Sequence, residues 1–574
     1  MRKRATKSVI PGFGLTTGIT IAMLSVLIII PLLSILGYSF TLSPEEFFKV
    51  ITTPSTMRAF GTSIGCAAIA ALINVVFGVI LAWVLTRYTF PAKRFVDGLI
   101  ELPFAMPTAV AGITLSKMYA ENGEIGSLFA PLGIEISYTH IGIVIALVFI
   151  GIPFVVRSVQ PVLQDLDPAF EEAAHIMGAN RTMAFRRIIV PELTPAILTG
   201  FGLALARGIG EFGSVIYISG NSAKDGTQVV SYVIMQKLNA GSANYADAAA
   251  IALVLLIISF ILLFAINAIQ IHASKRVSGL ADSSAASALA PSSAANQGNM
   301  ALKVVLMVLA LGFMIIMLVI PLCSVLVKSL GQGLDFYLAA ISTPYVLSAL
   351  RVTLIATVCA VAVNTLFGLV ASWSLTKFSF KGQRVLTTLI DIPFSISPVI
   401  AGLAFVMTFG RTGWARPIVE AVNNVLGTDI SFVFSVPGVV LATIFVTFPF
   451  VVRELLPVMH AQGSDEEAAA ALMGARGLRI FRQITFPKIR WALLYGIILC
   501  AARAFGEFGA VYALSKTRGE TFTLPLEVDA LYMAGTPDSI TAAFAVSSIL
   551  VILAIVLLVL RNIVEYRAKK REAR

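Results

Sequence analysis

The sequence predicts an all-helical polytopic membrane protein, made of two parallel repeats of six membrane-spanning helices each. Of its 574 residues 57% are hydrophobic and 13% charged, whereas a soluble domain carries about 25% charged residues. The mean hydropathy is +0.90, and apolar runs reach the roughly 20 residues that a helix needs to cross a bilayer. Long stretches of the chain also occur twice. This composition excludes a disordered chain, a secreted disulfide scaffold and a cytosolic enzyme.

The repeats are visible as two constant offsets along the chain. The segment WVLTRYTF at Trp83 aligns with WSLTKFSF at Trp373, an offset of 290 residues. Farther on, IPFVVR at Ile152 aligns with FPFVVR at Phe448, an offset of 296 residues. The second copy has therefore gained six residues between the two blocks. This pattern indicates duplication of one unit, followed by divergence of a loop.

Each copy holds six long apolar segments, which we expect to cross the membrane as helices. In the first copy they are residues 17–39, 60–86, 99–118, 140–163, 195–219 and 248–272. In the second copy they are residues 302–329, 349–376, 387–410, 435–458, 491–513 and 540–562. A re-entrant or interfacial helix is the alternative for any one segment.

The domain boundaries follow from this division. We expect one half in residues 1–275 and another in residues 301–574. Between them, residues 276–300 are rich in serine and alanine and lack a hydrophobic period. Such a segment cannot build a core, so we expect a flexible tether.

The distribution of lysine and arginine predicts the orientation. These residues concentrate at the amino terminus, after the second span, between the fourth and fifth spans, and after the sixth. Loops rich in positive charge face the cytoplasm. Because six spans are an even number, both termini are expected there, and the repeats are parallel about an axis along the membrane normal. The first apolar run is too long for a signal peptide and no cleavage site follows it, so none is expected.

Several other functions are not expected. The net charge of +11 comes from basic residues that flank apolar segments, so nucleic acid is not an expected partner. The cysteines lie singly in apolar runs and are interpreted as small buried hydrophobic residues, and the histidines do not cluster, so no metal site is expected. The chain has no P-loop motif and no Gly-Lys dipeptide. Neither ATP binding nor catalysis by this chain is therefore expected. The cysteines are Cys66, Cys323, Cys359 and Cys500.

The most informative segment lies between the fourth and fifth spans, from Asp167 to Leu198. It contains the helix-forming run EEAA, a break at Gly178 and an amphipathic stretch that ends at Pro191, and glycine allows a sharp turn after the short helix. Three apolar residues recur at helical spacing and would project towards a partner's groove; they are Ala173, Ile176 and Met177. An ordinary loop packed on its own spans is the alternative. The pattern returns in the second copy as DEEAAAALMGARGLRIFRQITFP, which favours docking.

This pattern, EAA followed by GA and then Phe, Ile and Pro, resembles the coupling loop of bacterial ABC importer permeases. The resemblance implies the type I ABC importer permease fold, with each loop docked in a cleft of an ATPase subunit whose nucleotide-driven closure moves the spans. The first copy carries the pattern at Glu172, Ala173, Ala174, Gly178, Ala179, Phe185, Ile188 and Pro191. The expected coupling residues are these first five with Glu171, and in the second copy Glu467, Ala468, Ala469, Gly474 and Ala475. Ala468 stands where the first copy has Glu172, so the acidic contact of the second half stays open.

Longer strings extend the resemblance. PFAMPTAVAG, IPFVVRSVQPVLQDL and RGIGEFGSVIYISGN are similar to the T-type permease subunit of sulfate and thiosulfate importers, and DIPFSISPVIAGL and ARAFGEFGAVYALS to the W-type subunit. The resemblance implies both subunits fused in one chain of the bacterial cytoplasmic membrane. It also implies two ATPase subunits that bind ATP and magnesium, and a periplasmic or lipid-anchored sulfate-binding protein. The alternatives are a permease for ferric iron, thiamine or molybdate, an ion-coupled secondary transporter, and a passive channel.

Charged residues inside the expected spans point to function, because a charge in hydrocarbon is costly unless paired or hydrated. Arg207 and Glu211 stand four residues apart near the middle of the fifth span, as do Arg503 and Glu507. Each pair would share a helix face. The pairs either line a pathway in which the arginines attract a dianion weakly, or neutralise each other and lock helix packing.

Prolines interrupt the third span of each half and would free backbone groups for a passage or gate, or would only kink the helix. They are Pro103, Pro107, Pro393 and Pro398. The candidate pathway or gate residues are Pro107, Thr108, Arg207, Glu211, Pro398, Arg503 and Glu507. Four other charges near the cytoplasmic side are expected to be structural; they are Glu101, Arg157, Asp391 and Arg453.

Overall fold

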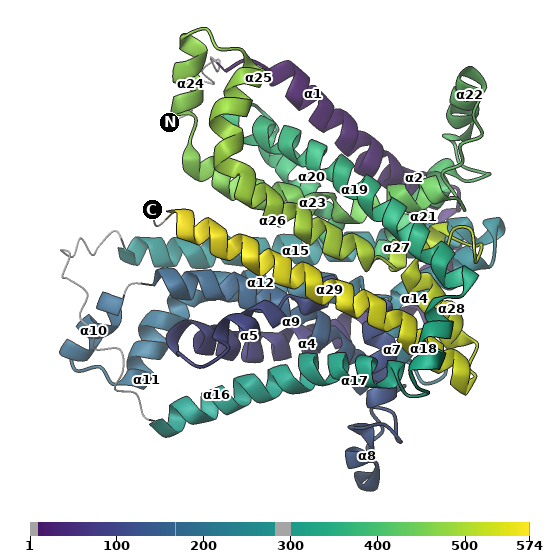
Figure 1. Cartoon of the computed structure of the whole chain (residues 1–574), viewed down its shortest axis with the longest axis horizontal. Coiled ribbons are helices and arrows are strands. Elements are labelled where there is room, and N and C mark those ends of the chain that lie inside the picture. Colours follow the sequence, from purple (N-terminus) through teal and green to yellow (C-terminus); the bar gives the residue numbers. More distant parts are fainter. Residues whose placement is uncertain (1–9, 167, 282–299, 573–574) are drawn as a thin grey trace.

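The computed structural model describes residues 10–166, 168–281 and 300–572, and these form helices without a strand (Figure 1). The first half contains α1 (Phe13–Leu24), α2 (Ile30–Ser39), α3 (Pro44–Thr52), α4 (Pro54–Arg87), α5 (Lys93–Leu99), α6 (Leu102–Ala105), α7 (Thr108–Met118), α8 (Gly126–Phe129), α9 (His140–Asp165), α10 (Pro168–Ile176), α11 (Arg181–Ala184), α12 (Val190–Ile209), α13 (Val215–Ile218), α14 (Val230–Asn239) and α15 (Tyr245–Ala281). The second contains α16 (Met300–Met314), α17 (Ile320–Ser329), α18 (Leu334–Ile341), α19 (Pro344–Lys377), α20 (Gln383–Ser395), α21 (Pro398–Phe409), α22 (Arg416–Leu426), α23 (Val436–Gln462), α24 (Asp465–Leu472), α25 (Gly477–Ile480), α26 (Phe486–Phe505), α27 (Gly509–Leu514), α28 (Leu524–Met533) and α29 (Pro537–Glu572).

Within the described residues, ten helical segments are long and apolar enough to cross a membrane. Two further helix pairs, α5–α6 with α7 and α20 with α21, pass the same test but are bent by 105° and 106°. Counting each bent pair as one crossing gives the twelve expected spans, with the third span of each half broken. The bends lie at Pro107 and at Ser397, where the backbone leaves the helical region. The interruption is therefore next to Pro107 and Pro398, whereas Pro393 lies inside α20.

The fifth span of each half lies earlier in the sequence than expected. It runs from Thr182 to Ile209 and from Gly477 to Phe505, so the expected ranges 195–219 and 491–513 end too late. The amphipathic stretch before Pro191 belongs to this helix. Proline has no backbone N–H to donate, and a π-helical turn at Phe185–Ile189 lets the helix continue through Pro191 without that hydrogen bond. The apolar residues after the end of α12 form the separate short helix α13.

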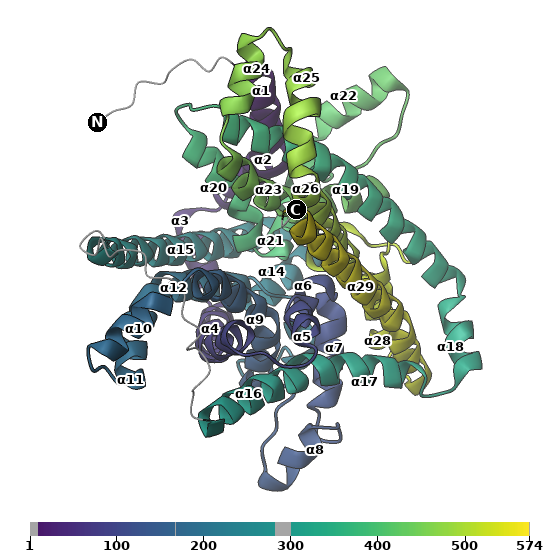
Figure 2. The same ribbon diagram turned by 60° about the vertical axis from the view of Figure 1, so that its left-hand side comes forward.

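The first span of each half packs against the other half. Helix α1 lies along α19, and α16 lies along α4 (Figures 1 and 2). The hydroxyl groups of Thr17 and Ser374 are 2.7 Å apart, and the rings of Phe77 and Phe313 stack with centroids 4.1 Å apart. The halves are therefore interlocked in one body. Helix α15 continues to Ala281, six residues into the expected tether, and residues 282–299 of that tether lie outside the described residues.

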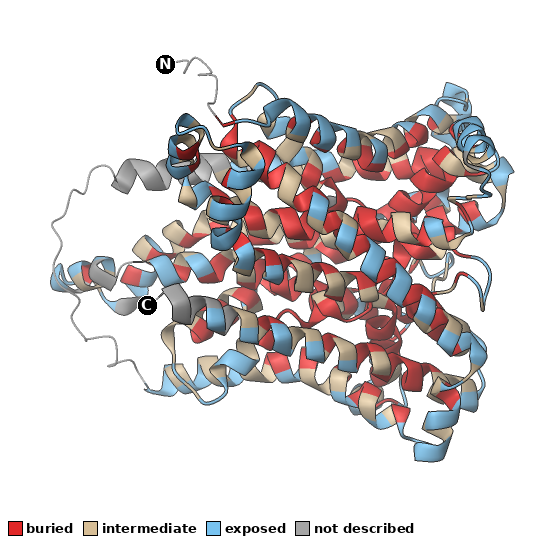
Figure 3. Ribbon diagram, turned by 45° about the horizontal axis from the view of Figure 1, so that its top comes forward, coloured by how far each residue is buried: buried red, intermediate tan, exposed pale blue. Residues whose placement is uncertain are grey.

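Buried residues are concentrated on the helices in the middle of the molecule, and exposed residues lie on the outer helices and at both ends (Figure 3). Cys66 and Cys500 are buried as expected, whereas Cys323 and Cys359 are exposed. The expectation was wrong for this second pair because an apolar residue of a membrane helix is stable facing lipid as well as facing protein.

Candidate functional site

Two short helices, α10 and α24, project at the same end of the molecule (Figure 1). Each is followed by a glycine in the left-handed region, Gly178 with φ 84° and Gly474 with φ 87°. In each loop the amide of the next residue donates a hydrogen bond back into the helix, from Ala179 to Ala174 at 2.9 Å and from Ala475 to Ala470 at 3.0 Å. This is a Schellman ending, which favours glycine at the turn. We call α10 and α24, each with its glycine turn, the two knuckles.

The tips of the knuckles carry exposed apolar side chains. Ile176 and Met177 are 87% and 88% exposed, and their repeat counterparts Leu472 and Met473 are 75% and 82% exposed. Large apolar side chains that stand clear of the molecule indicate a contact with another protein. The other predicted coupling residues are distributed as follows: Ala174 and Glu467 are buried, Glu171, Glu172, Ala179, Ala468 and Ala475 are half-buried, and Ala173, Gly178, Ala469 and Gly474 are exposed.

An ion pair attaches each knuckle to the end of the second span. Arg87 pairs with Glu171 at 2.6 Å, and Lys377 pairs with Glu467 at 2.7 Å. All four residues correspond under the repeat offsets, so Glu467 is the counterpart of Glu171 and not a displaced Glu172. Burial by itself raises the pKa of Glu467, but hydrogen bonds from Lys377 and Thr485 more than offset this and hold the pKa below its ordinary value. The second knuckle is thus held by a buried ionised carboxylate.

An aromatic pair joins the second and fifth spans of each half. The rings of Trp83 and Phe185 meet edge to face with centroids 5.6 Å apart, and those of Trp373 and Phe481 do the same at 5.6 Å. Such pairs are worth about 0.5–1.5 kcal/mol beyond the area that they bury. The second span, which carries the ion pair to the knuckle, is therefore also attached to the fifth span of its half.

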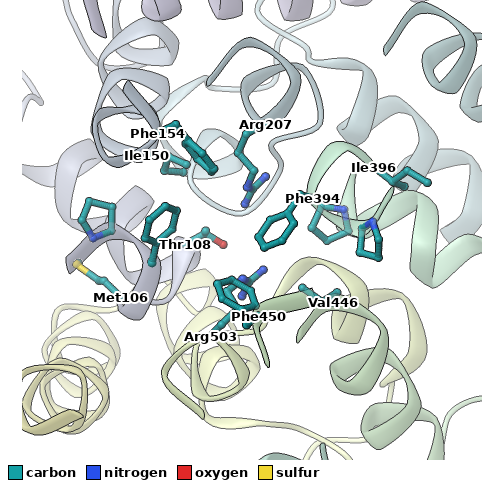
Figure 4. Close-up of a pocket in the computed structure, with 14 residues that line it drawn as sticks. Met106, Thr108, Ile150, Phe154, Arg207, Phe394, Ile396, Val446, Phe450 and Arg503 are labelled. Carbon is teal, nitrogen blue, oxygen red and sulfur yellow. The ribbon is translucent and has the colours of Figure 1, made fainter. Parts of the chain in front are cut away.

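A cavity of about 40 Å³ lies between the halves (Figure 4). Seven residues of the first half line it, and the other seven are their repeat counterparts. The first set is Pro103, Phe104, Met106, Thr108, Ile150, Phe154 and Arg207, and the second is Pro393, Phe394, Ile396, Pro398, Val446, Phe450 and Arg503. Arg207 and Arg503 point into this space from opposite sides (Figure 4). The cavity therefore lies on the axis that relates the repeats.

Each of these arginines is paired with a buried glutamate. Arg207 lies 2.6 Å from Glu211, and Arg503 lies 2.5 Å from Glu507. The glutamate side chains are 1% exposed, against 15% and 14% for the arginines. The second oxygen of Glu211 accepts the backbone N–H of Ser214 at 3.0 Å. The carboxylates are thus turned into the protein, and only the guanidinium groups face the cavity.

The position of these pairs along the chain corrects the prediction. Arg207 lies in the last turn of α12, not near the middle of the span, and Glu211 lies after the helix has ended. The pair is not carried on one helix face. The chain leaves the helix at Gly210, and glycine at this position allows the backbone of the other half to approach closely. The second half repeats the arrangement at the end of α26.

The helix ends meet the broken third spans across the interface between the halves. A Cβ atom added to Gly210 would lie 3.0 Å from the Cα of Ser397, and one added to Gly506 would lie 3.2 Å from the Cα of Pro107. Within the first half, a Cβ on Gly213 would come 2.1 Å from Oγ1 of Thr108. Backbone packs directly on backbone at Gly210 and Gly506. The sequence analysis missed the glycines, although GEFG occurs in both copies at the same offset.

Two regions of the chain, residues 74–279 and 364–570, each match the family described as the binding-protein-dependent transport system inner membrane component. Together they cover more than half of the chain. The chain belongs to this family. Each half thus contains one copy of this transport component, in agreement with the presence of a knuckle and of seven cavity residues in both halves. Members of the family are multi-pass inner-membrane permeases that work with an ATPase and a binding protein, and the family is a transport component, not an enzyme.

Individual relatives match the permease by halves. The sulfate transport system permease protein CysT of Salmonella typhimurium is 42% identical over 275 residues, which is 48% of this chain and 98% of the relative. The protein CysW of the same system in Escherichia coli is 43% identical over 259 residues, 45% of this chain and 86% of the relative. The resemblance to T-type and W-type subunits in one chain is confirmed. The crystal structure of a bacterial alginate ABC transporter in complex with alginate pentasaccharide-bound periplasmic protein is 17% identical, with a TM-score of 0.39, over 46% of this chain and 93% of that chain.

The four charges that the sequence placed near the cytoplasmic side also form ion pairs. Arg157 lies 2.8 Å from Glu101, and their counterparts Arg453 and Asp391 are also 2.8 Å apart. Glu101 additionally pairs with Arg561 of α29. These contacts hold the third, fourth and last spans together, which is the structural role that the sequence indicated for the four charges.

Proposed function

We propose that this chain is the complete membrane-spanning part of an ABC importer that moves sulfate or thiosulfate into the cytoplasm by alternating access. The observation that carries the proposal is the pair of matched knuckles with exposed apolar tips, on a body whose central cavity receives one arginine from each half. The choice of anion is supported by the relatives that match each half, whose names describe sulfate transport.

The knuckles are the proposed docking sites for two copies of a cytoplasmic ATPase subunit. ATP and magnesium would be bound by that subunit, and no cofactor is assigned to this chain. This assignment makes the knuckle end cytoplasmic, in agreement with the positive-inside rule for Arg186 and Arg482 at the beginning of the fifth spans, and both termini are proposed to lie on that side. Closure of the ATPase pair must favour one conformation of the permease over the other, because a partner indifferent to the two shifts nothing.

The cavity is the proposed passage for the anion. Two guanidinium groups face it, while Glu211 and Glu507 neutralise their charge from behind. A dianion would therefore be attracted weakly and would not be trapped. A volume of about 40 Å³ holds about three water-sized spheres, so the anion passes only after the halves separate. In this scheme selection belongs to the periplasmic or lipid-anchored sulfate-binding protein.

The test is uptake of radiolabelled sulfate into proteoliposomes that contain this chain, its ATPase and its binding protein. We expect uptake that requires ATP and the binding protein. Unlabelled thiosulfate should compete with the labelled sulfate and reduce its uptake. Uptake that is driven by an ion gradient without ATP, or that proceeds down a gradient without the ATPase, would contradict the proposal. ATP-driven uptake of ferric iron, thiamine or molybdate but not of sulfate would contradict the choice of substrate alone.

A further inference from the structure

A second, larger cavity of about 670 Å³ lies along the seam between α4 and α9. It lies at the end of α4 that is remote from the knuckles, because Arg87 at the other end of this helix contacts α10. Ile69 and Ile141 in its lining are 52% and 49% exposed, so it is a groove open to the outside of the bundle. The groove is lined by Arg58, Gly61, Thr62, Gly65, Cys66, Ile69, His140, Ile141, Val144 and Gly226.

The groove exists because two side chains are missing from one face of α4. Gly61 and Gly65 are one turn apart, and no atom lies within 4 Å of the place where a Cβ atom of either would be. In the second half the aligned residues are Arg351 and Ile355, whose side chains would occupy such a space. The groove is therefore a property of the first half that duplication alone does not explain.

The length of the groove matches one leaflet of a bilayer. From Arg58 to Ile69 the helix advances eleven residues, or about 16 Å. The hydrocarbon core of a membrane is about 30 Å thick, so the groove covers about half of it. Its deep part is apolar, and its two basic side chains, Arg58 and His140, lie at the outer rim, near the beginning of α4 and α9. This is the order of groups in a phospholipid, whose phosphate lies outside its acyl chains.

The rim is arranged to leave positive charge available. The carbonyl oxygen of Gly226 accepts the hydroxyl of Thr62 at 2.6 Å and lies 3.2 Å from Nε2 of His140. Because a carbonyl only accepts, Nε2 carries the proton, and the imidazole is fixed at the rim. Among the described residues that line the groove none is acidic, so Arg58 meets no countercharge within the lining. A phosphate, and still more a headgroup with net negative charge, complements this rim.

We propose that this groove binds one phospholipid with an anionic headgroup, of which phosphatidylglycerol is the simplest example. One acyl chain lies over Gly61 and Gly65, and the phosphate lies against Arg58 and His140. The site belongs to the leaflet remote from the knuckles. It is independent of the transported substrate, so it stands even if the anion assigned above is wrong.

The experiment is native mass spectrometry of the purified full-length chain, titrated with phosphatidylglycerol and with phosphatidylcholine of the same acyl chains. Each variant introduces the residue that the second half has at the aligned position. Arg58→Ser corresponds to Ser348, and Gly65→Ile corresponds to Ile355. Arg351→Ser is the matched control, since it removes an equally exposed arginine from the corresponding helix α19. We expect the wild-type chain to retain phosphatidylglycerol about tenfold better than phosphatidylcholine, the range of one charged hydrogen bond.

Arg58→Ser should abolish this preference, Gly65→Ile should weaken both lipids, and Arg351→Ser should change neither. Equal retention of the two lipids by the wild-type chain would overturn the proposal, as would an Arg58→Ser variant that behaves like Arg351→Ser. Normal binding in Gly65→Ile would place the lipid elsewhere and would overturn it too. A single symmetric peak in size-exclusion chromatography shows that a variant is folded. Arg58→Ser and Gly65→Ile change different parts of the groove, so if one of them does not fold, the other still tests the proposal.

Discussion

Phe212 and Phe508 stack on each other, with ring centroids 6.1 Å apart and planes inclined by 13°. The two residues occupy the same position in the two repeats, and both are buried, at 1% and 0% exposure. A residue that meets its own counterpart must lie on the axis that relates the halves. The cavity with Arg207 and Arg503 lies on the same axis. A passage along this axis would require the two rings to separate, so we predict that they act as a gate.

Replacement of Phe212 by leucine should make this gate leak. The change keeps most of the apolar volume, so we expect a loss of stability below about 1.5 kcal/mol, while the ring contact is lost. Proteoliposomes loaded with radiolabelled sulfate should then release it in the absence of ATP. Phe405→Leu is the control, since Phe405 packs edge to face on Phe445 within the second half. Equal retention of sulfate by Phe212→Leu and the wild-type chain would mean that the ring pair is only packing.

Apolar contact at the knuckles predicts the effect of placing a charge there. The double variant Met177→Asp with Met473→Asp changes two exposed side chains, so its stability should stay within about 0.5 kcal/mol of the wild type. Co-purification of the ATPase should fall about tenfold or more, as for loss of an interface residue worth about 2 kcal/mol. Leu132→Asp, at a site 71% exposed outside the knuckles, should leave co-purification unchanged. An ATPase that stays bound to the double variant would refute docking at the knuckles.

The arginines of the cavity must be tested without leaving a buried charge behind. Arg207→Gln alone would strand Glu211 and cost about 3–5 kcal/mol, so the informative variant is Arg207→Gln with Glu211→Gln. We expect this double variant to fold and to lose sulfate uptake by about tenfold or more, the scale of one charged hydrogen bond. Arg416→Gln with Glu420→Gln, an exposed pair of the same spacing, should transport normally. Normal uptake by the double variant Arg207→Gln with Glu211→Gln would show that this ion pair has only a structural role.

The parts of this permease that depend on local sequence were predictable. The repeat offsets, the number of spans and the glycine turn at Gly178 follow from residues near one another in the chain. The interlocked first spans were not, because contacts such as Thr17 with Ser374 join segments more than 350 residues apart. Hydropathy does not report which apolar helix faces which.

The end of the fifth span shows a second limit of sequence reasoning. The apolar run VIYI after GEFG is typical of a continued helix, but the helix ends before Gly210, where backbone of the other half occupies the space that a side chain would need. Because the predicted end of the span was too late, Glu211 was expected on the same helix face as Arg207, whereas it lies after the helix has ended. A residue whose surroundings come from the other half cannot be placed by periodicity in its own segment.

Acid should loosen the second knuckle. Because the pKa of Glu467 lies below its ordinary value of 4.5 in the folded protein, its ion pair with Lys377 contributes stability that is complete at about pH 7 and is lost as the pH falls through the lowered pKa. Proteolysis at the loop around Gly474 should thus stay slow down to about pH 5 and accelerate below about pH 4, as far as the protease used remains active. Glu467→Gln should be cut faster at about pH 7, with little further change in acid. Thr485→Val, which removes one hydrogen bond to the carboxylate and keeps Lys377, should give an intermediate rate. Wild-type protection in Glu467→Gln would show that other contacts hold the loop, such as the ion pair of Glu466 with Lys488.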